Sequence, residues 1–152
     1  MDNGIVLESG DERILDKIQE LWEELNQLHL EKSLDFKQHY KDFTFQSRKE
    51  SLIKYTYEGK LFIVIARHEK NKIGYCIAGV IDNVGEIESI FVKSDYRNNH
   101  IGNTLMAASL NWIKSCNVKK TIVKVSVGNE EVFGFYSKYG FAPRLIELQL
   151  QS

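Results

Sequence analysis

The sequence predicts a single α/β domain, built on a mixed sheet with helices on both faces. Its 152 residues suffice for one domain, and a hydrophobic content of 43% with a single proline is typical of a compact globular chain. Its segments follow the order β, α, α, β, β, β, α, β, α, β. Three consecutive strands favour antiparallel pairing, whereas the later alternation of strand and helix favours parallel pairing.

The first half is expected to hold a strand, two helices and a hairpin. Apolar residues recur at helical spacing from Ile14 to Leu28, with charges on the opposite face. Two β-rich runs that flank a polar turn predict the hairpin. The expected elements are a strand over 4–8, a helix over 14–28, a loop or short helices over 30–45, a helix over 46–57 and strands over 61–66 and 73–81.

The second half opens with an alternating strand that places Ile87, Ser89 and Phe91 on one face. An amphipathic helix, a β-rich run, an aromatic helix that opens at Asn129 and a last alternating strand come after it. These later elements are expected over 101–115, 121–127, 129–139 and 145–150.

Composition argues against several classes of function. A net charge of −1 and a pI of about 6.4 give no basic field that would recruit nucleic acid or acidic membranes. The N-terminus has no apolar signal-peptide core, and no apolar run reaches membrane-spanning length. Cys76 and Cys116 lie far apart, without metal-ligand spacing. We therefore expect a soluble cytoplasmic protein with reduced thiols and no metal site.

The stretch from Gly85 to Ile113 predicts an anion site. A strand runs into the polar loop 93–99, and a helix begins near His100 to Gly102. The first N–H groups of a helix lack internal partners, and the helix dipole favours negative charge there. Arg97 adds a cation with a geometry suited to phosphate. This pattern indicates a ligand that carries phosphate.

Two motifs make the chain resemble GNAT-family N-acetyltransferases over nearly its whole length. The family's acetyl-CoA motif, Gln/Arg-x-x-Gly-x-Gly/Ala, stands here as 97–102, with His100 in place of the first glycine. The later motif, Asn-x-x-Ala-x-x-Phe-Tyr-x-x-x-Gly-Phe, stands as 129–141, with Val132 in the alanine position. Both motifs occur in the right order, about one βα unit apart.

The resemblance implies acetyl-CoA as co-substrate and a mixed, mostly antiparallel sheet of six to seven strands with about four helices. It also implies that the fourth strand splays from the fifth, so that backbone groups near Ile90 polarise the thioester and bind the pantetheine arm. The residues it implies for acetyl-CoA binding are Ile90, Phe91, Val92, Arg97, Asn98, Asn99, His100, Ile101, Gly102, Asn103, Thr104, Asn129 and Tyr136.

Three residues are candidates for the chemistry. Tyr136 matches the family's general acid, which protonates the CoA sulfur; its other reading is an aromatic residue of the core. Glu86 and Glu88 are two apart on one strand, which predicts that both face the same side. Either could accept the proton of the amine. Alternatively, they are solvated or attract a cationic substrate.

We therefore expect an enzyme that transfers an acetyl group to a primary amine of a small molecule by direct attack. One alternative is a protein or peptide N-acetyltransferase that acts on an N-terminal α-amine or a lysine. Another is an acyl-CoA-binding sensor without catalysis, which only His100 supports. The run 145–150 has an alternating apolar face with no guarding charge cluster, which makes a homodimer plausible.

Overall fold

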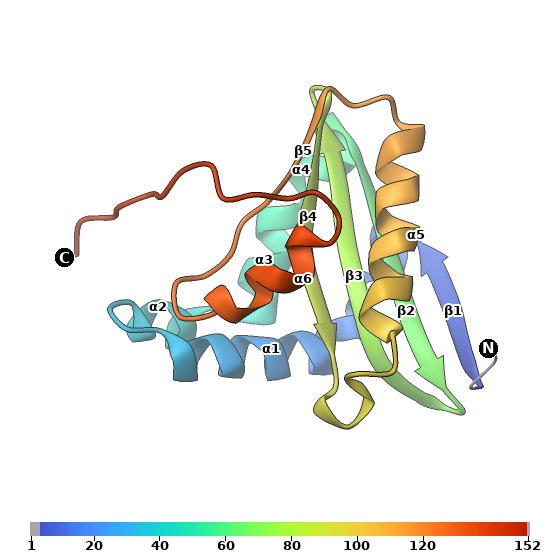
Figure 1. The fold of residues 1–152 in the computed structure, drawn as a ribbon, viewed down its shortest axis with the longest axis horizontal. Coiled ribbons are helices and arrows are strands. Elements are labelled where there is room, and N and C mark those ends of the chain that lie inside the picture. Colours follow the sequence, from blue (N-terminus) through green and yellow to red (C-terminus); the bar gives the residue numbers. More distant parts are fainter. Residues whose placement is uncertain (1–3, 152) are drawn as a thin grey trace.

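The computed structural model describes residues 4–151 as a five-stranded sheet with strand order β1-β2-β3-β4-β5 (Figure 1). The first four strands are antiparallel to their neighbours, and β5 is parallel to β4. The expected mixed, mostly antiparallel sheet is thus confirmed. The strands are β1 (Ile5–Gly10), β2 (Lys60–His68), β3 (Asn71–Ile81), β4 (Val84–Val92) and β5 (Lys120–Val123).

Helices cover both faces of the sheet, as expected. A 3-10 helix over Glu12–Ile18 leads into α1 and packs with α1, α3 and α4 on one face, whereas α5 and α6 pack on the other. The predicted second helix is broken at Ile53, which ends α3 and precedes α4. The α-helices are α1 (Gln19–Lys32), α2 (Lys37–Asp42), α3 (Phe45–Leu52), α4 (Lys54–Glu58), α5 (Ile101–Ser115) and α6 (Phe133–Ser137).

Each face of the sheet has its own apolar core. The α1 core lies under α1, α3 and α4 and is centred on Ile63, Tyr75 and Ile77. The α5 core lies under α5 and α6 and is centred on Leu105 and Met106. All five residues are fully buried. Among residues 4–151, no helix has both the length and the apolar character that a membrane crossing requires.

A β-bulge in β4 changes the expected alternation. Ile77 of β3 lies opposite Ser89, and its neighbour Ala78 lies opposite Ile87, so Glu88 is an extra residue without its own partner. Beyond the bulge, the side chains exchange faces. Ile87 packs in the α5 core, whereas Phe91 packs in the α1 core. The prediction that Ile87 shares a face with Ser89 and Phe91 was wrong for this reason.

The expected count of six to seven strands was also wrong, because the described chain forms five. The run 121–127 pairs with β4 only as far as Val123. Residues 142–151 have no strand assignment, although 145–150 has a strand-like pattern. This C-terminal arm projects away from the sheet, and its end lies beyond α2 (Figure 1). A strand needs a partner for its backbone groups, and the arm has none within the described chain.

Candidate functional site

Half of β4 has a free edge on the side that faces β5. The parallel ladder joins Val84–Ile87 of β4 to Lys120–Val123 of β5 and then stops. From Ser89 to Val92, β4 pairs only with β3, and Glu88 is the unpaired residue of the bulge. Backbone groups of this stretch that point away from β3 therefore have no ladder partner. Ile90, Phe91 and Val92, all predicted to bind the co-substrate, lie on this edge.

The free edge leads directly into the N-terminus of a long helix. A loop with a 3-10 turn over Ser94–Tyr96 connects β4 to α5, which has 15 residues. No side chain caps α5. The first N–H groups of the helix, at Ile101, Gly102 and Asn103, thus point toward the loop without a side-chain partner. This is the geometry of an anion site.

His100 precedes the helix in a left-handed backbone conformation, with φ 62° and ψ 13°. Asn98 also has a positive φ of 70°. Glycine adopts this region without strain, and among other residues Asn and His are enriched there. The backbone geometry therefore explains why the family motif has glycine where this chain has His100. The His100 side chain is exposed, and its Nδ1 lies 3.4 Å from Nδ2 of Asn103.

Several loop side chains have partners within the loop region. The Arg97 Nε donates to the carbonyl oxygen of Val92 at 2.9 Å, and its guanidinium lies 5.5 Å from the centroid of the Phe91 ring. Asn99 donates weakly to the carbonyl of Tyr96, at 3.3 Å. The Thr104 hydroxyl donates to the carbonyl oxygen of His100.

Asn103 and Gly102 connect the helix start to the C-terminal motif. The Tyr139 hydroxyl donates to Oδ1 of Asn103. A Cβ at Gly102 would lie 3.4 Å from the ring of Phe135, which is an ordinary van der Waals contact, so α6 packs directly beside the start of α5. The two sequence motifs thus meet in space.

Tyr136 lies buried in the α5 core, at 9% exposure, against Phe135 and Phe141. Its hydroxyl has no hydrogen-bond partner within residues 4–151. Burial, with a smaller contribution from Cys76, raises the pKa of Tyr136 to about 12. Cys76 lies opposite Ile90 in the sheet, so Tyr136 lies near the free edge of β4. A phenol with this pKa keeps its proton at neutral pH.

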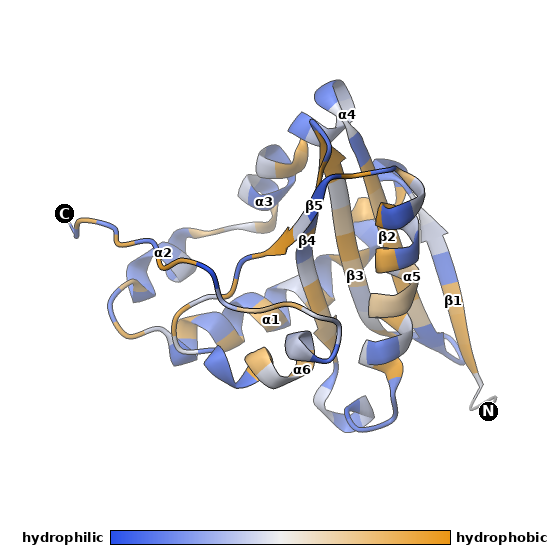
Figure 2. Ribbon diagram, turned by 45° about the horizontal axis from the view of Figure 1, so that its top comes forward, coloured by the Kyte–Doolittle hydropathy of each residue, from blue (hydrophilic) through white to orange (hydrophobic). Residues whose placement is uncertain are grey.

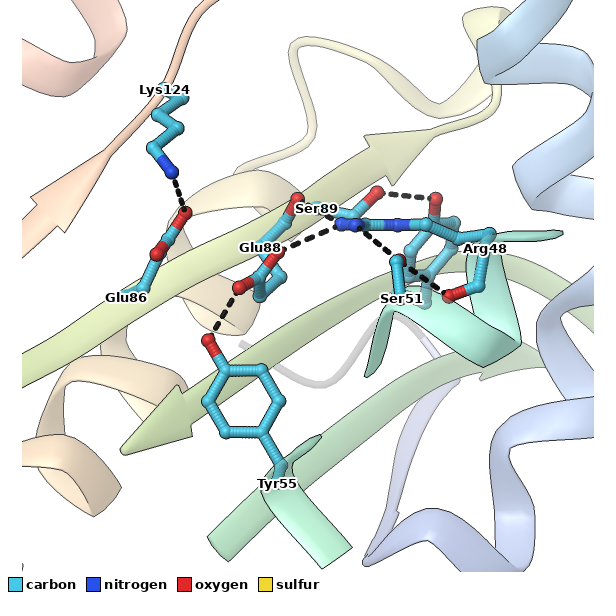
Figure 3. Close-up of polar contacts among 8 residues, drawn as sticks. Arg48, Ser51, Tyr55, Glu86, Glu88, Ser89 and Lys124 are labelled. Atoms are coloured by element: carbon cyan, nitrogen blue, oxygen red, sulfur yellow. Dashed lines mark hydrogen bonds and ion pairs between the residues drawn. The ribbon is translucent and has the colours of Figure 1, made fainter. Parts of the chain in front are cut away.

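Glu88 is held on the opposite face by two partners from the α3–α4 segment (Figure 3). The Arg48 Nη2 donates to the Glu88 carbonyl oxygen at 2.7 Å and to its Oε1 at 3.0 Å, and the Tyr55 hydroxyl donates to Oε2. Only 7% of the Glu88 side chain is exposed. The extra residue of the bulge is therefore fixed through both its backbone and its carboxylate.

Glu86 lies beside this cluster and is held less firmly. Its nearest cation, Lys124 Nζ, is 3.7 Å away and belongs to a side chain that is 80% exposed. Burial, followed by the charge of Glu88, raises the pKa of Glu86, while Lys124 and more distant cations oppose the shift. The two glutamates share a face as predicted, but they differ in environment. Glu86 is the one whose carboxylate is available to take a proton.

The C-terminal end of α1 and α2 meets the segment that follows β5. Lys32 Nζ donates to Oδ1 of Asn129 at 3.1 Å, and the Tyr40 hydroxyl donates to Oγ of Ser126 at 2.8 Å. Asn129 precedes the 3-10 turn Glu130–Val132 but does not cap it with its side chain. These two hydrogen bonds connect the α1–α2 region to the segment that follows β5, beyond the point where β5 separates from β4.

An open groove of about 580 Å³ lies between α1 and the loop after β4. It is lined by four glutamates of α1 and by Phe91, Ser94 and Arg97 of the β4 side. The glutamates are Glu20, Glu23, Glu24 and Glu31. The groove therefore has a negative wall beside the loop that precedes α5.

Sequence reasoning did not single out Arg48, Tyr55 or Lys124. A signal for the first two was present, because Arg48, Leu52 and Tyr55 follow helical spacing and Leu52 is apolar. Their contact with a strand 33 to 40 residues later has no local signature. For Lys124, the parallel pairing of β5 with β4 is what brings it near Glu86.

The two glutamates should respond differently to neutralisation. Glu88→Gln leaves the buried Arg48 cation without its counter-charge and should lower the free energy of unfolding by roughly 3 kcal/mol. The pKa of Glu86 is raised in the folded state, so the ionised form of Glu86 destabilises the fold. The free energy of unfolding therefore decreases as pH rises through the folded-state pKa of Glu86. Glu86→Gln removes that loss and should be at least as stable as the parent at pH 7. Urea denaturation of the three proteins checks this, and equal destabilisation by both substitutions would contradict it.

Comparison with known proteins agrees with this geometry. The acetyltransferase (GNAT) family model matches residues 18–141. The chain is 29% identical over 70 residues to the "Putative (ribosomal protein bS18)-alanine N-acetyltransferase" of Bacillus subtilis (strain 168). That match covers 46% of this chain and 46% of the relative, so it spans about half the length of the relative.

Three similar solved structures share the fold along nearly their whole length. A GCN5-related N-acetyltransferase from Ralstonia eutropha JMP134 has a TM-score of 0.76 at 13% identity, and the match covers 97% of this chain and 99% of the Ralstonia chain. The PaiA N-acetyltransferase from Thermoplasma acidophilum, in complex with coenzyme A, has a TM-score of 0.74 at 17% identity. That match covers 94% of this chain and 92% of the Thermoplasma chain. An aminoglycoside acetyltransferase from an uncultured soil metagenomic sample, in complex with sisomicin, has a TM-score of 0.71 at 17% identity and covers 99% and 98%. With the family match over 18–141, the chain belongs to the acetyltransferase (GNAT) family of enzymes.

Proposed function

We propose that the chain transfers the acetyl group of acetyl-CoA to a primary amine of a cationic small molecule by direct attack. One observation carries the proposal: the free edge of β4 begins between a protonated Tyr136 on one face and Glu86 on the other, and leads into the uncapped N-terminus of α5. A thioester at this junction would have an acid on the thiol side and a base on the amine side.

The donor would bind along the edge and the loop. Backbone groups of 88–92 would pair with the amides of the pantetheine arm as an added strand does. The N–H groups of Ile101, Gly102 and Asn103 would hold the pyrophosphate at the positive end of α5. An N–H near Ile90 would donate to the thioester carbonyl and stabilise the negative charge that develops there.

The transfer itself needs two proton movements. The neutral amine nitrogen forms a bond to the carbonyl carbon, and the carbon–sulfur bond then breaks with its electron pair on sulfur. Tyr136 donates its proton to that thiolate, because its raised pKa keeps it protonated until the thiolate forms. Glu86 accepts the proton that the amine loses, directly or through water, which its raised pKa favours.

The acidic groove supports a cationic small-molecule acceptor. Its four glutamates would attract a compound with more than one ammonium group. Solved relatives in complex with sisomicin and with a CoA–acetylneamine bisubstrate analogue are consistent with acceptors of this kind. A second candidate, acetylation of a protein α-amine, is favoured by the partial match to the Bacillus subtilis protein.

A thiol-release assay with acetyl-CoA tests the function and the acid together. The wild-type chain should release CoA with polyamines or aminoglycosides in preference to a peptide with N-terminal alanine. Tyr136→Phe should lower turnover by about 10²-fold or more, since proton donation contributes about 10²–10⁴. The affinity for acetyl-CoA, measured by calorimetry, should stay nearly unchanged.

Tyr57→Phe is the matched control, because Tyr57 is 78% exposed and should keep full turnover. Preference for the peptide would select the second candidate. If acetyl-CoA binds but no amine releases thiol, the chain is a sensor and the enzymatic proposal fails. Equal turnover of Tyr136→Phe and wild type would remove Tyr136 from the chemistry.

The role of Glu86 predicts a pH dependence. If its carboxylate is the base, kcat/KM should fall as pH drops through its raised pKa, because the protonated form cannot accept a proton. Glu86→Gln should lower kcat/KM at neutral pH and remove this acidic limb. An unchanged pH profile in a folded Glu86→Gln variant would exclude Glu86 as the base. Water would then accept the proton of the amine, and Glu86 would at most attract a cationic substrate.

A further inference from the structure

Lys124 is an amine that the chain itself places beside the proposed base. It is the first residue after β5, whose tip is apolar (Figure 2). Figure 3 shows its side chain reaching toward Glu86, with Nζ 3.7 Å from Oε2. Within residues 4–151, Lys124 is the one cationic side chain that forms an ion pair with Glu86. The chain therefore holds an ammonium group at the carboxylate where the acceptor amine is proposed to lose its proton.

The backbone puts this lysine at the point where β4 and β5 separate. Val123 pairs with Ile87 as the last rung of the parallel ladder, and Lys124 follows directly. The free edge of β4 also begins directly after Ile87. Lys124 thus lies at the junction to which the thioester is assigned in the proposed function.

The side chain of Lys124 is free to move. It is 80% exposed, and its distance to Glu86 is that of an ion pair rather than a hydrogen bond. Lysine carries its amine on a flexible four-carbon stem, so the nitrogen can shift without a change in the backbone. Lys54 also acts on the charge of Glu86, but its Nζ lies over the ring of Tyr55, 5.2 Å from the centroid.

We propose that the enzyme acetylates its own Lys124 when acetyl-CoA is bound and no acceptor amine is present. This inference rests on the proposed function, because the donor, the acid and the base are the same. The Lys124 nitrogen would take the place of the acceptor nitrogen, and the products would be free CoA and an acetylated lysine.

The atoms of this step balance. Lys124 Nζ forms a bond to the carbonyl carbon, and the carbon–sulfur bond breaks with its electron pair on sulfur. Glu86 accepts in turn the two protons that the nitrogen loses and passes them to water. Tyr136 protonates the thiolate and regains its proton from water, so one proton is released for each acetyl group.

An acceptor amine would suppress this reaction. Only 13% of the Glu86 side chain is exposed, which leaves little room for two ammonium groups at one carboxylate. Like charges that close also repel each other. A cationic acceptor would therefore displace the Lys124 ammonium, so added polyamine should slow the modification of Lys124.

Mass spectrometry of the enzyme after incubation with acetyl-CoA alone tests the proposal. The chain should gain one acetyl group, and peptide mapping should place it on Lys124. Lys120 is the internal control, since it is exposed on the same strand but pairs with Val84, two residues before Glu86. Lys124 should react at least about 10²-fold faster than Lys120, because only Lys124 has the acid and the base beside it. Equal modification of the two lysines would indicate spontaneous acylation and overturn the proposal.

Two variants with an unchanged charge sharpen the test. Lys124→Arg should abolish the modification and the slow release of thiol that occurs without an acceptor. Lys120→Arg should retain both. The fraction of chains modified per minute should not change when the protein is diluted at constant acetyl-CoA. A rate that rises with protein concentration would indicate transfer between copies and would contradict transfer within one chain.

The outcome also separates this inference from the proposed function. If the enzyme releases thiol with an added amine while Lys124 stays unmodified, self-acetylation is wrong and the proposed function stands. If acetyl-CoA binds but neither Lys124 nor any amine gains an acetyl group, both are wrong.

Discussion

The bulge at Glu88 is the constraint on which the site depends. Arg48 donates hydrogen bonds to both the backbone oxygen and one carboxylate oxygen of Glu88, and the Tyr55 hydroxyl donates to the other carboxylate oxygen. One extra residue exchanges the faces of everything that follows in β4. Phe91 thereby enters the α1 core while Ile90 and Val92 turn to the α5 core. The bulge comes directly after the last residue of β4 that pairs with β5, at Ile87.

In the proposed mechanism, the two proton transfers fall on opposite faces of the sheet. Tyr136 comes from the α5 side, where burial keeps its phenol protonated, and Glu86 from the α3–α4 side, where burial and Glu88 make its carboxylate a better base. Groups with such different tasks need different surroundings, and two separate cores provide them. In that mechanism Glu88 is a positioning residue rather than the base, because Arg48 donates to one of its carboxylate oxygens and Tyr55 to the other.

Most of the fold could be predicted because its signals are local. Helical spacing in 14–28, the β2–β3 hairpin and the strand–loop–helix around Arg97 each lie within a short window. The bulge at Glu88 could not be predicted, since Arg48 reaches it from 40 residues away. The pattern at 145–150 is strand-like, but a pattern alone does not supply the partner that a strand requires. The difference between Glu86 and Glu88 depends on burial and charge, which spacing does not encode.

Hydrogen exchange of the backbone amides, measured by NMR with and without acetyl-CoA, tests the central claim most directly. If the free edge of β4 and the start of α5 hold the co-substrate, slowed exchange should concentrate in 88–92 and 101–103. The amides of β1 and the outer face of α1 should not change. Binding that leaves 88–92 and 101–103 unprotected, with protection elsewhere, would contradict this description of the site.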